Sequence, residues 1–174
     1  LRALDSYNLT MSGNNLDDHL RHGVVIENTY GSVLSGNMIE ESQGTAIVLG
    51  RDCYGITLSA NVLAHNFGGG IALRDAWGIA VSANTFTINA EYGLRIGPAA
   101  GRVTVTGNNF SDAFIGPGLR RDDEAGGILL EETEAITVTG NGFSGLATDA
   151  IRGAATSEQV EIHDNVITDT PREE

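Results

Sequence analysis

The chain has 174 residues, which is long enough for one domain with a continuous hydrophobic core. Its 23 glycines, three prolines and 41% hydrophobic residues are typical of short strands joined by tight turns. The formal net charge is −13 and all basic residues are Arg, so a nucleic acid duplex would meet a repulsive surface and we expect no such partner. No apolar run is long enough to span a bilayer, so we expect no membrane partner. The single Cys53 excludes an internal disulfide and is expected to be a buried thiol.

A repeat of about 23 residues runs through the chain. Its first landmark is an Asn at a turn, with spacings of 23, 24, 23, 24, 33 and 24 residues: Asn14, Asn37, Asn61, Asn84, Asn108, Asn141 and Asn165. A second landmark, a Gly or Ala, follows nine residues after five of these: Gly23, Ala46, Gly70, Gly93 and Ala150. In the fifth coil the matching residue is Gly127, so we place a ten-residue loop insertion within residues 113–124.

Each coil contains three short segments in which apolar and polar residues alternate, as in strands with one buried face. The segment before the Asn has the inward pairs Ile56/Leu58, Ile79/Val81, Val103/Val105 and Ile136/Val138. The segment after the Asn has the inward row Leu16, Ile39, Leu63, Phe86, Phe110, Phe143 and Ile167. The segment after the second landmark has the pairs Val24/Ile26, Ile47/Leu49, Ile71/Leu73, Leu94/Ile96 and Ile128/Leu130. We predict an all-β solenoid of about seven coils with three strands per coil.

The asparagines have a structural explanation. Asn tolerates the left-handed backbone conformation that a sharp corner requires, so we expect each Asn to adopt it. An amide stacked in register can also donate a hydrogen bond to the next coil and accept one from it. We therefore predict an asparagine ladder rather than a catalytic role.

This pattern resembles the right-handed parallel β-helix repeat of the pectate-lyase-like superfamily, and the resemblance covers essentially residues 1–174 as a single domain. The superfamily includes polysaccharide lyases, glycoside hydrolases, alginate epimerases and phage tailspikes, so the fold does not define the chemistry. The resemblance implies a polysaccharide partner and an extracellular or periplasmic location. Leu1 aligns with Val24 inside a strand, which leads us to expect a fragment that continues into upstream coils, or end-to-end self-association.

In this superfamily ligand grooves commonly run along the outer face of the third strand of each coil. One outward row there reads Arg2, Val25, Val48, Ala72, Arg95, Leu129 and Arg152, and the next reads Glu27, Gly50, Arg74, Gly97, Glu131 and Ala154. Neighbouring coils lie about 4.8 Å apart, so Arg74 and Arg95 are expected within reach of one anionic group. Two guanidinium groups suit the carboxylate of a uronic acid and can neutralise charge that develops during proton abstraction.

Other residues complete this candidate site. We predict that Arg74, Arg95 and Tyr92 are catalytic, with Tyr92 or an Arg in proton transfer, and that Trp77 stacks on a sugar ring. Asp75, Glu27 and Glu131 are predicted substrate contacts, as are Arg120 and Arg121 in the insertion, which can wall the groove. The alternative for Arg74 is an ion pair with Asp75 or Glu27 on a solvated face.

Two further patterns carry a weaker indication. Asp52 and Asp75 occupy equivalent turns on adjacent coils and are a possible Ca²⁺ site. Alginate epimerases of the superfamily carry an Asp-Pro-His element, but Asp18-His19 lacks the Pro, so that role is not carried over. His19 and His22 have no third ligand nearby and are interpreted as surface residues.

Two functions remain open from the sequence. The first is a carbohydrate-active domain, a lyase or epimerase that acts on an acidic polysaccharide. The second is a non-catalytic solenoid that binds polysaccharide, mediates adhesion or serves as a spacer. Convergence of Arg74, Arg95 and Tyr92 in a cleft would favour the enzyme, whereas a flat face would favour the second function.

Overall fold

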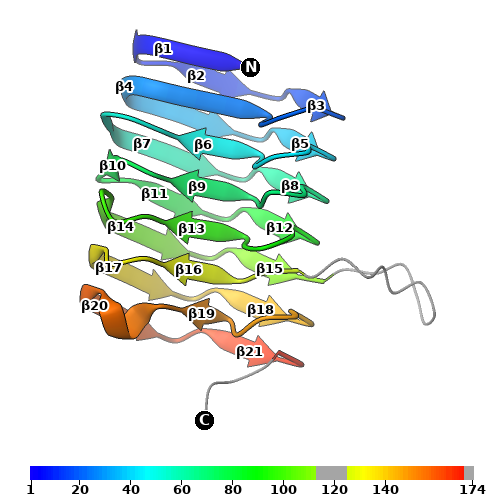
Figure 1. Cartoon of the computed structure of the whole chain (residues 1–174), viewed down its shortest axis with the longest axis vertical. Helices are drawn as coiled ribbons and strands as arrows, with labels where there is room; N and C mark the ends of the chain where they lie inside the picture. Colours follow the sequence, from blue (N-terminus) through cyan, green and yellow to red (C-terminus); the bar gives the residue numbers. More distant parts are fainter. Residues whose placement is uncertain (113–124, 171–174) are drawn as a thin grey trace.

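The computed structural model describes residues 1–112 and 125–170, which form a parallel β-helix of stacked coils (Figure 1). The front strands are β1 (Arg2–Tyr7), the first half of β4 (Val24–Ser35), β6 (Ile47–Leu49), β9 (Ile71–Leu73), β13 (Leu94–Ile96), β16 (Ile128–Leu130) and β19 (Ile151–Arg152). The back strands are β2 (Thr10–Ser12), the second half of β4, β7 (Cys53–Ser59), β10 (Ala76–Trp77), β11 (Ala80–Ser82), β14 (Gly101–Thr106), β17 (Glu134–Thr139) and β20 (Glu158–His163), with a 3₁₀ turn η1 (Ala154–Thr156) before β20. The side strands are β3 (Asn15–Asp17), β5 (Met38–Glu40), β8 (Val62–Ala64), β12 (Thr85–Thr87), β15 (Asn109–Ser111), β18 (Gly142–Ser144) and β21 (Val166–Thr168).

Two parallel sheets contain the described strands. The side strands form a seven-stranded sheet, which confirms the predicted all-β parallel solenoid. The front and back strands belong to one 14-stranded sheet, because β4 runs unbroken from one to the other. In both sheets each strand pairs in parallel with its equivalent one coil away. Leu94 pairs with Ile128 across the coil that carries the insertion, so the added residues leave the register unchanged. No helix in the described part of the chain is long and apolar enough to cross a bilayer.

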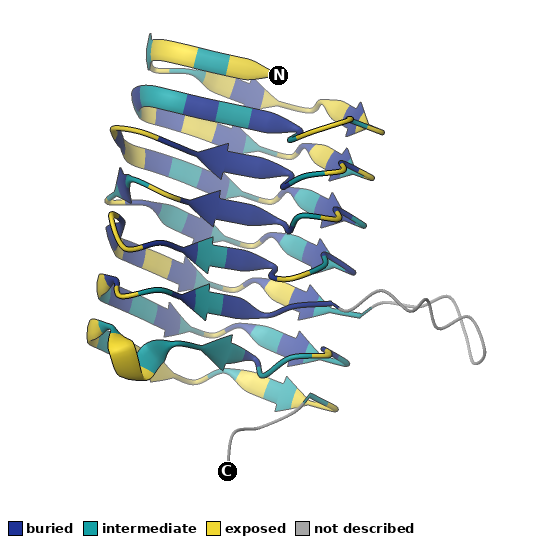
Figure 2. Cartoon of the chain, viewed as in Figure 1, coloured by how far each residue is buried: buried dark blue, intermediate teal, exposed yellow. Residues whose placement is uncertain are grey.

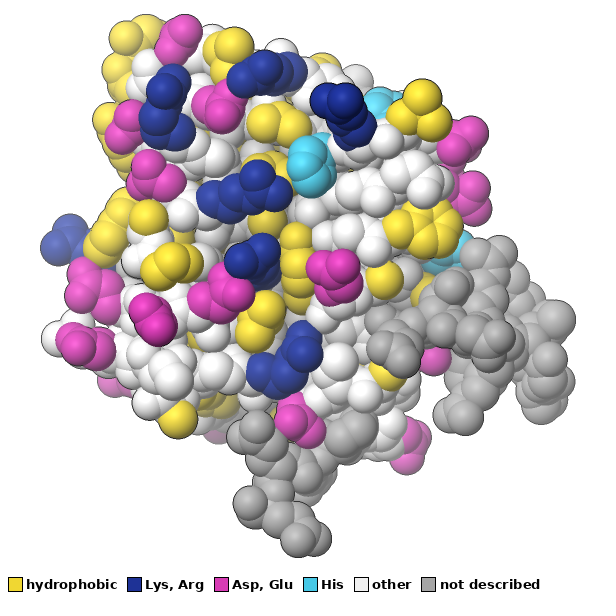
Figure 3. All heavy atoms as spheres, viewed as in Figure 1, with side chains coloured by type: hydrophobic (Ala, Val, Ile, Leu, Met, Phe, Trp, Pro, Cys, Tyr) yellow, Lys and Arg dark blue, Asp and Glu magenta, His cyan; other side chains and the backbone are white. Residues whose placement is uncertain are grey.

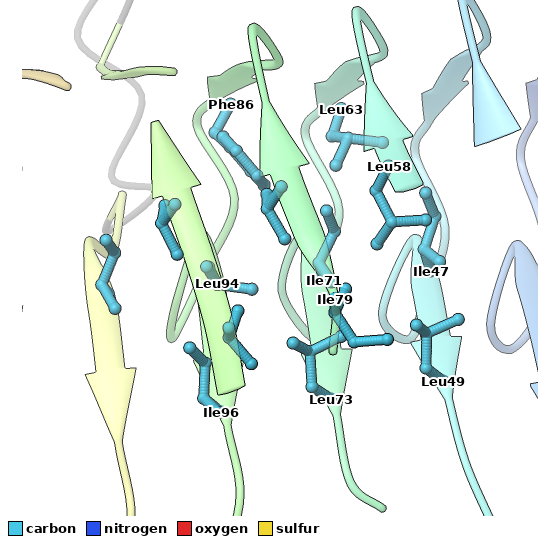
Figure 4. Close-up of a cluster of buried hydrophobic side chains, with 14 of the residues drawn as sticks. Ile47, Leu49, Leu58, Leu63, Ile71, Leu73, Ile79, Phe86, Leu94 and Ile96 are labelled. Atoms are coloured by element: carbon cyan, nitrogen blue, oxygen red, sulfur yellow. The ribbon is translucent and has the colours of Figure 1, made fainter. Parts of the chain in front are cut away.

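The inward rows expected from the alternation form one continuous core. Front-strand pairs such as Ile47/Leu49 and Ile71/Leu73 are fully buried, and they meet side-strand residues such as Leu63 inside the solenoid (Figure 4). Burial follows the same rows along the length of the molecule (Figure 2). Cys53 lies in this core as predicted, and burial raises the pKa of its thiol.

The asparagine ladder is confirmed along the whole row. Each amide nitrogen donates to the carbonyl oxygen of the next Asn at 2.9 to 3.0 Å, from Asn14 through to Asn165. A shorter ladder, which the sequence reading missed, joins Asn66 to Asn89 at 2.9 Å on the far side of the side strands.

The expected backbone conformation of the asparagines is wrong. The left-handed residue is the one before each Asn: Gly13, Gly36, Ala60, Ala83, Gly107, Gly140 and Asp164 have φ between 53° and 68°. The turn is completed one residue early because the Asn must direct its amide along the ladder. Ala60 and Ala83 therefore carry the strain of a Cβ atom in a left-handed conformation.

Replacing both residues, Ala60→Gly and Ala83→Gly, is expected to raise the free energy of unfolding by about 1 kcal/mol in total, because relief of left-handed strain exceeds the entropy that Gly adds to the unfolded chain. Urea denaturation measures the change. The matched control is Gly36→Ala, where φ is 65° and an added Cβ meets no atom within 4 Å; it should lower stability. A double variant less stable than the parent chain would contradict the prediction.

Candidate functional site

The outward rows of the front strands are those expected from the sequence. Arg95 pairs with Ala72 on one side and Leu129 on the other. Arg74 follows β9 and lies between Gly50 and Gly97 of the adjacent coils. Basic side chains gather in a strip down the middle of this face (Figure 3), although the chain as a whole is strongly acidic. We call His22, Arg74 and Arg95 the basic strip.

Arg74 is an exposed guanidinium with no hydrogen bond or ion pair to any described residue. The predicted alternative, a pair with Glu27 or Asp75, is wrong. Glu27 accepts from Arg2 at 2.6 Å instead, and Asp75 accepts the backbone N–H of Asp52 at 3.1 Å. Arg74 is therefore available to a ligand.

Arg95 is held by a neighbour on the next coil. Its Nε donates to Oε2 of Glu131 at 2.7 Å, and both side chains are about one-third exposed (39% and 32%). This hydrogen bond raises the pKa of Arg95, which also lies close enough to Tyr92 for a smaller effect of the same sign. Glu131 thus orients Arg95 at the edge of the strip and is itself only partly free to contact a ligand.

Tyr92 is buried, not exposed as its predicted role in proton transfer requires. Only 4% of it is exposed, and its ring packs on the outer face of the front strands with Val48 and Ala72. The hydroxyl lies 2.9 Å from Oγ1 of Thr45. Because Thr45 donates its own proton to the carbonyl of Gly68 at 2.8 Å, Tyr92 is the donor in this pair.

His22 is a residue that the sequence reading treated as ordinary surface and that the structure places in the site. Its Nδ1 accepts the backbone N–H of Thr45 at 2.9 Å, which leaves the proton of the neutral ring on Nε2. Burial lowers the pKa of His22, and the nearby charge of Arg74 lowers it further. His22 is therefore a neutral hydrogen-bond donor beside Arg74.

The repeat contained a signal for this arrangement. The residue before the second landmark is His22, Thr45, Gly69 and Tyr92 in four successive coils. A Cβ atom at Gly69 would overlap the ring of Tyr92, so the glycine lets the tyrosine reach two coils back to Thr45. Aligning this row shows that a residue without a side chain precedes Tyr92 by one coil, but it does not by itself give the direction of the tyrosine ring.

Other predicted site residues lie apart from the strip. Trp77 is on β10 among the back strands, where it pairs in register with Tyr54 and Gly101, so its predicted contact with the same sugar as Arg74 is not supported. Asp52 lies 3.9 Å from Nε of Arg51, and the described residues contain no group of three possible metal ligands around Asp52 and Asp75. Arg120 and Arg121 lie outside the described residues.

The coils, the asparagine ladder and the outward rows define a β-helix solenoid protein. The family model "right handed beta helix region" matches residues 1–167, and the chain belongs to this family. No curated protein sequence matches the chain.

Solved structures show the same fold at low sequence identity. The chain is similar to the periplasmic alginate epimerase AlgG (13% identity, TM-score 0.59), covering 95% of this chain and 47% of the other. It is also similar to the A-module of the mannuronan C-5 epimerase AlgE6 of Azotobacter vinelandii (16% identity, TM-score 0.58), covering 99% and 58%. The chain thus spans about half the length of these structures.

Proposed function

We propose that this chain is a carbohydrate-active β-helix domain that binds an acidic polysaccharide along the basic strip. The observation that carries the proposal is Arg74, an exposed guanidinium without a partner among the described residues, with glycines on both neighbouring coils. A planar carboxylate suits the two parallel N–H groups of such a side chain. Arg95 supplies further donors on the adjacent coil, and His22 supplies one from two coils away on the other side.

As an enzyme, the domain is proposed to be a lyase or epimerase that acts on a uronate. In both reactions a proton leaves the carbon beside the carboxylate, and cationic donors on that carboxylate stabilise the charge that develops. Arg74 and Arg95 are proposed to hold the carboxylate. Tyr92 is proposed to exchange the proton, which requires its hydroxyl to leave Thr45 and turn toward the substrate. The similar structures named as alginate and mannuronan epimerases support this class of substrate.

A non-catalytic polysaccharide-binding module is the second candidate. Two observations favour it: the hydroxyl of Tyr92 is buried, and the carboxylate of Glu131 is occupied by Arg95. Neither group is then free to accept a proton from a bound sugar, whereas Arg74 can still bind one. Both candidates are proposed to act outside the cell or in the periplasm. Association through further coils, upstream or in a second copy, also remains a proposal.

The test is a binding and turnover screen with polymannuronate, polygalacturonate and a neutral glucan. We expect a uronate polymer to bind, and Arg74→Ala to weaken binding tenfold or more, as loss of a hydrogen bond to a charged group implies (about 1.5–3 kcal/mol). Arg102→Ala, which removes an exposed Arg from the back strands, is the charge-matched control and should have no comparable effect on the binding of a uronate polymer.

An independent readout is the imidazole titration of His22 by NMR. A bound carboxylate offsets the charge of Arg74, so the pKa of His22 should rise on binding, and it should also rise in Arg74→Ala. Unsaturated or epimerised products that disappear in Arg74→Ala would identify the enzyme. Binding without products would identify the module, and failure of every uronate polymer to bind would refute the proposal.

A further inference from the structure

A hollow lies around Trp77 on the back strands, next to the part of the front face that carries Arg95 and Glu131. It has a volume of about 440 Å³, and its lining includes Trp77, Glu132, Glu134, Thr156 and Glu158. These residues come from β10, β17, β20, η1 and the turn that follows β16. A second hollow, of about 600 Å³, adjoins Trp77 on the side of Tyr54 and Arg102. Trp77 is the one side chain besides Glu134 that borders both.

The indole ring lies close to the backbone of the next coil. A Cβ atom at Gly101 would lie 2.8 Å from Cζ3 and 3.0 Å from Cη2 of Trp77, so the glycine makes room for the six-membered ring. Beyond Gly101 the same row continues to Glu134 and Glu158, which pair in register. The row therefore places the aromatic ring of Trp77 next to the hydrogen-bond acceptors of Glu134 and Glu158.

The charges of this hollow differ from those of the basic strip. Glu132, Glu134 and Glu158 are exposed carboxylates, and none has an ion pair within the described residues. Like charges on directly paired strand positions repel one another and would also repel a uronate. Carboxylate oxygens accept hydrogen bonds from hydroxyl groups, and Arg102 adds donors at the rim of the second hollow.

We propose that the Trp77 hollow is a second sugar-binding site, specific for a neutral pyranose chain. The apolar face of the sugar stacks on the indole, and its hydroxyls donate to Glu134 and Glu158. The carboxylates exclude the acidic polymer proposed for the front face. The residues that form this site are Trp77, Gly101 and the glutamates, and none of them belongs to the basic strip.

Trp77 is the single tryptophan of the chain, so its fluorescence reports on this hollow without a label. The probes are hexasaccharides of β-linked glucose, xylose and mannose, with hexamannuronate and hexaglucosamine beside them. At least one neutral hexasaccharide is expected to change the emission saturably, and hexamannuronate is expected to leave it unchanged. No response to any neutral probe would overturn the proposal, as would tighter binding of either charged probe.

Variants are measured by calorimetry with the neutral probe that responds. Trp77→Ala should weaken binding about tenfold or more, which corresponds to loss of an aromatic stacking contact. Phe67→Ala, which removes a 49% exposed ring from a different turn, is the matched control and should bind normally. Glu134→Gln keeps an acceptor oxygen and should retain neutral-sugar binding within a few-fold while admitting hexamannuronate more readily. Equal binding by Trp77→Ala and the parent chain would refute the site, whatever the outcome for Arg74→Ala.

Discussion

Replacing Asn84 with Ala is expected to lower the free energy of unfolding by about 3–5 kcal/mol, because several buried polar groups lose their partners together. The Asn84 amide donates to Asn108 at 3.0 Å and to the carbonyl of Leu58 at 2.9 Å. Its oxygen accepts both the backbone and the side-chain N–H of Asn61 at 3.0 Å. Asn84 is 1% exposed, so water cannot replace these bonds.

Urea denaturation followed by circular dichroism measures this loss. The matched control is Asn14→Ala in the same row, where the side chain is exposed and donates to Asn37 and Ser12. That change is expected to cost about 1 kcal/mol, the net value of an ordinary hydrogen bond. If the two variants were equally stable, burial of the ladder would not be the source of its contribution.

Replacing Phe110 with Ala is expected to lower the free energy of unfolding by about 3–5 kcal/mol, through lost apolar burial and the cavity that remains. The ring is fully buried and is stacked between Phe86, at a centroid distance of 4.4 Å, and Phe143, at 4.9 Å. It also packs on Gly93, where a Cβ atom would lie 2.6 Å from its Cδ1. Rigid sheets on both sides limit how far the neighbours can collapse.

The same denaturation experiment serves for this variant, with Phe110→Leu as an intermediate that refills part of the volume. Phe67→Ala removes an equal ring from an exposed position and should change stability by no more than about 0.5 kcal/mol. A cost for Phe110→Ala no greater than that for Phe67→Ala would show that the phenylalanine stack does not contribute to the core as described.

The sequence alone determined the solenoid, its register and its core. Alternation with period two sets which residues face inward, and a repeat of constant length sets which residues stack, so Ile47, Ile71 and Leu94 were predicted as neighbours and lie side by side. The ladder followed from the same arithmetic, since each Asn occupies the same place in its coil. The repeat also located the row that holds Arg95 between Ala72 and Leu129.

Only the tertiary structure decided what the outward side chains do. Tyr92 is buried because Gly69, one coil away, leaves space for its ring, and Arg95 turns toward Glu131 rather than toward Arg74. Trp77 is carried past the turn and away from Arg74, to lie over Gly101. A repeat fixes backbone positions to within a strand spacing, but a long side chain spans one or two coils. Its direction therefore depends on the size and charge of neighbours that are distant in sequence, and that information exists only once the coils are stacked.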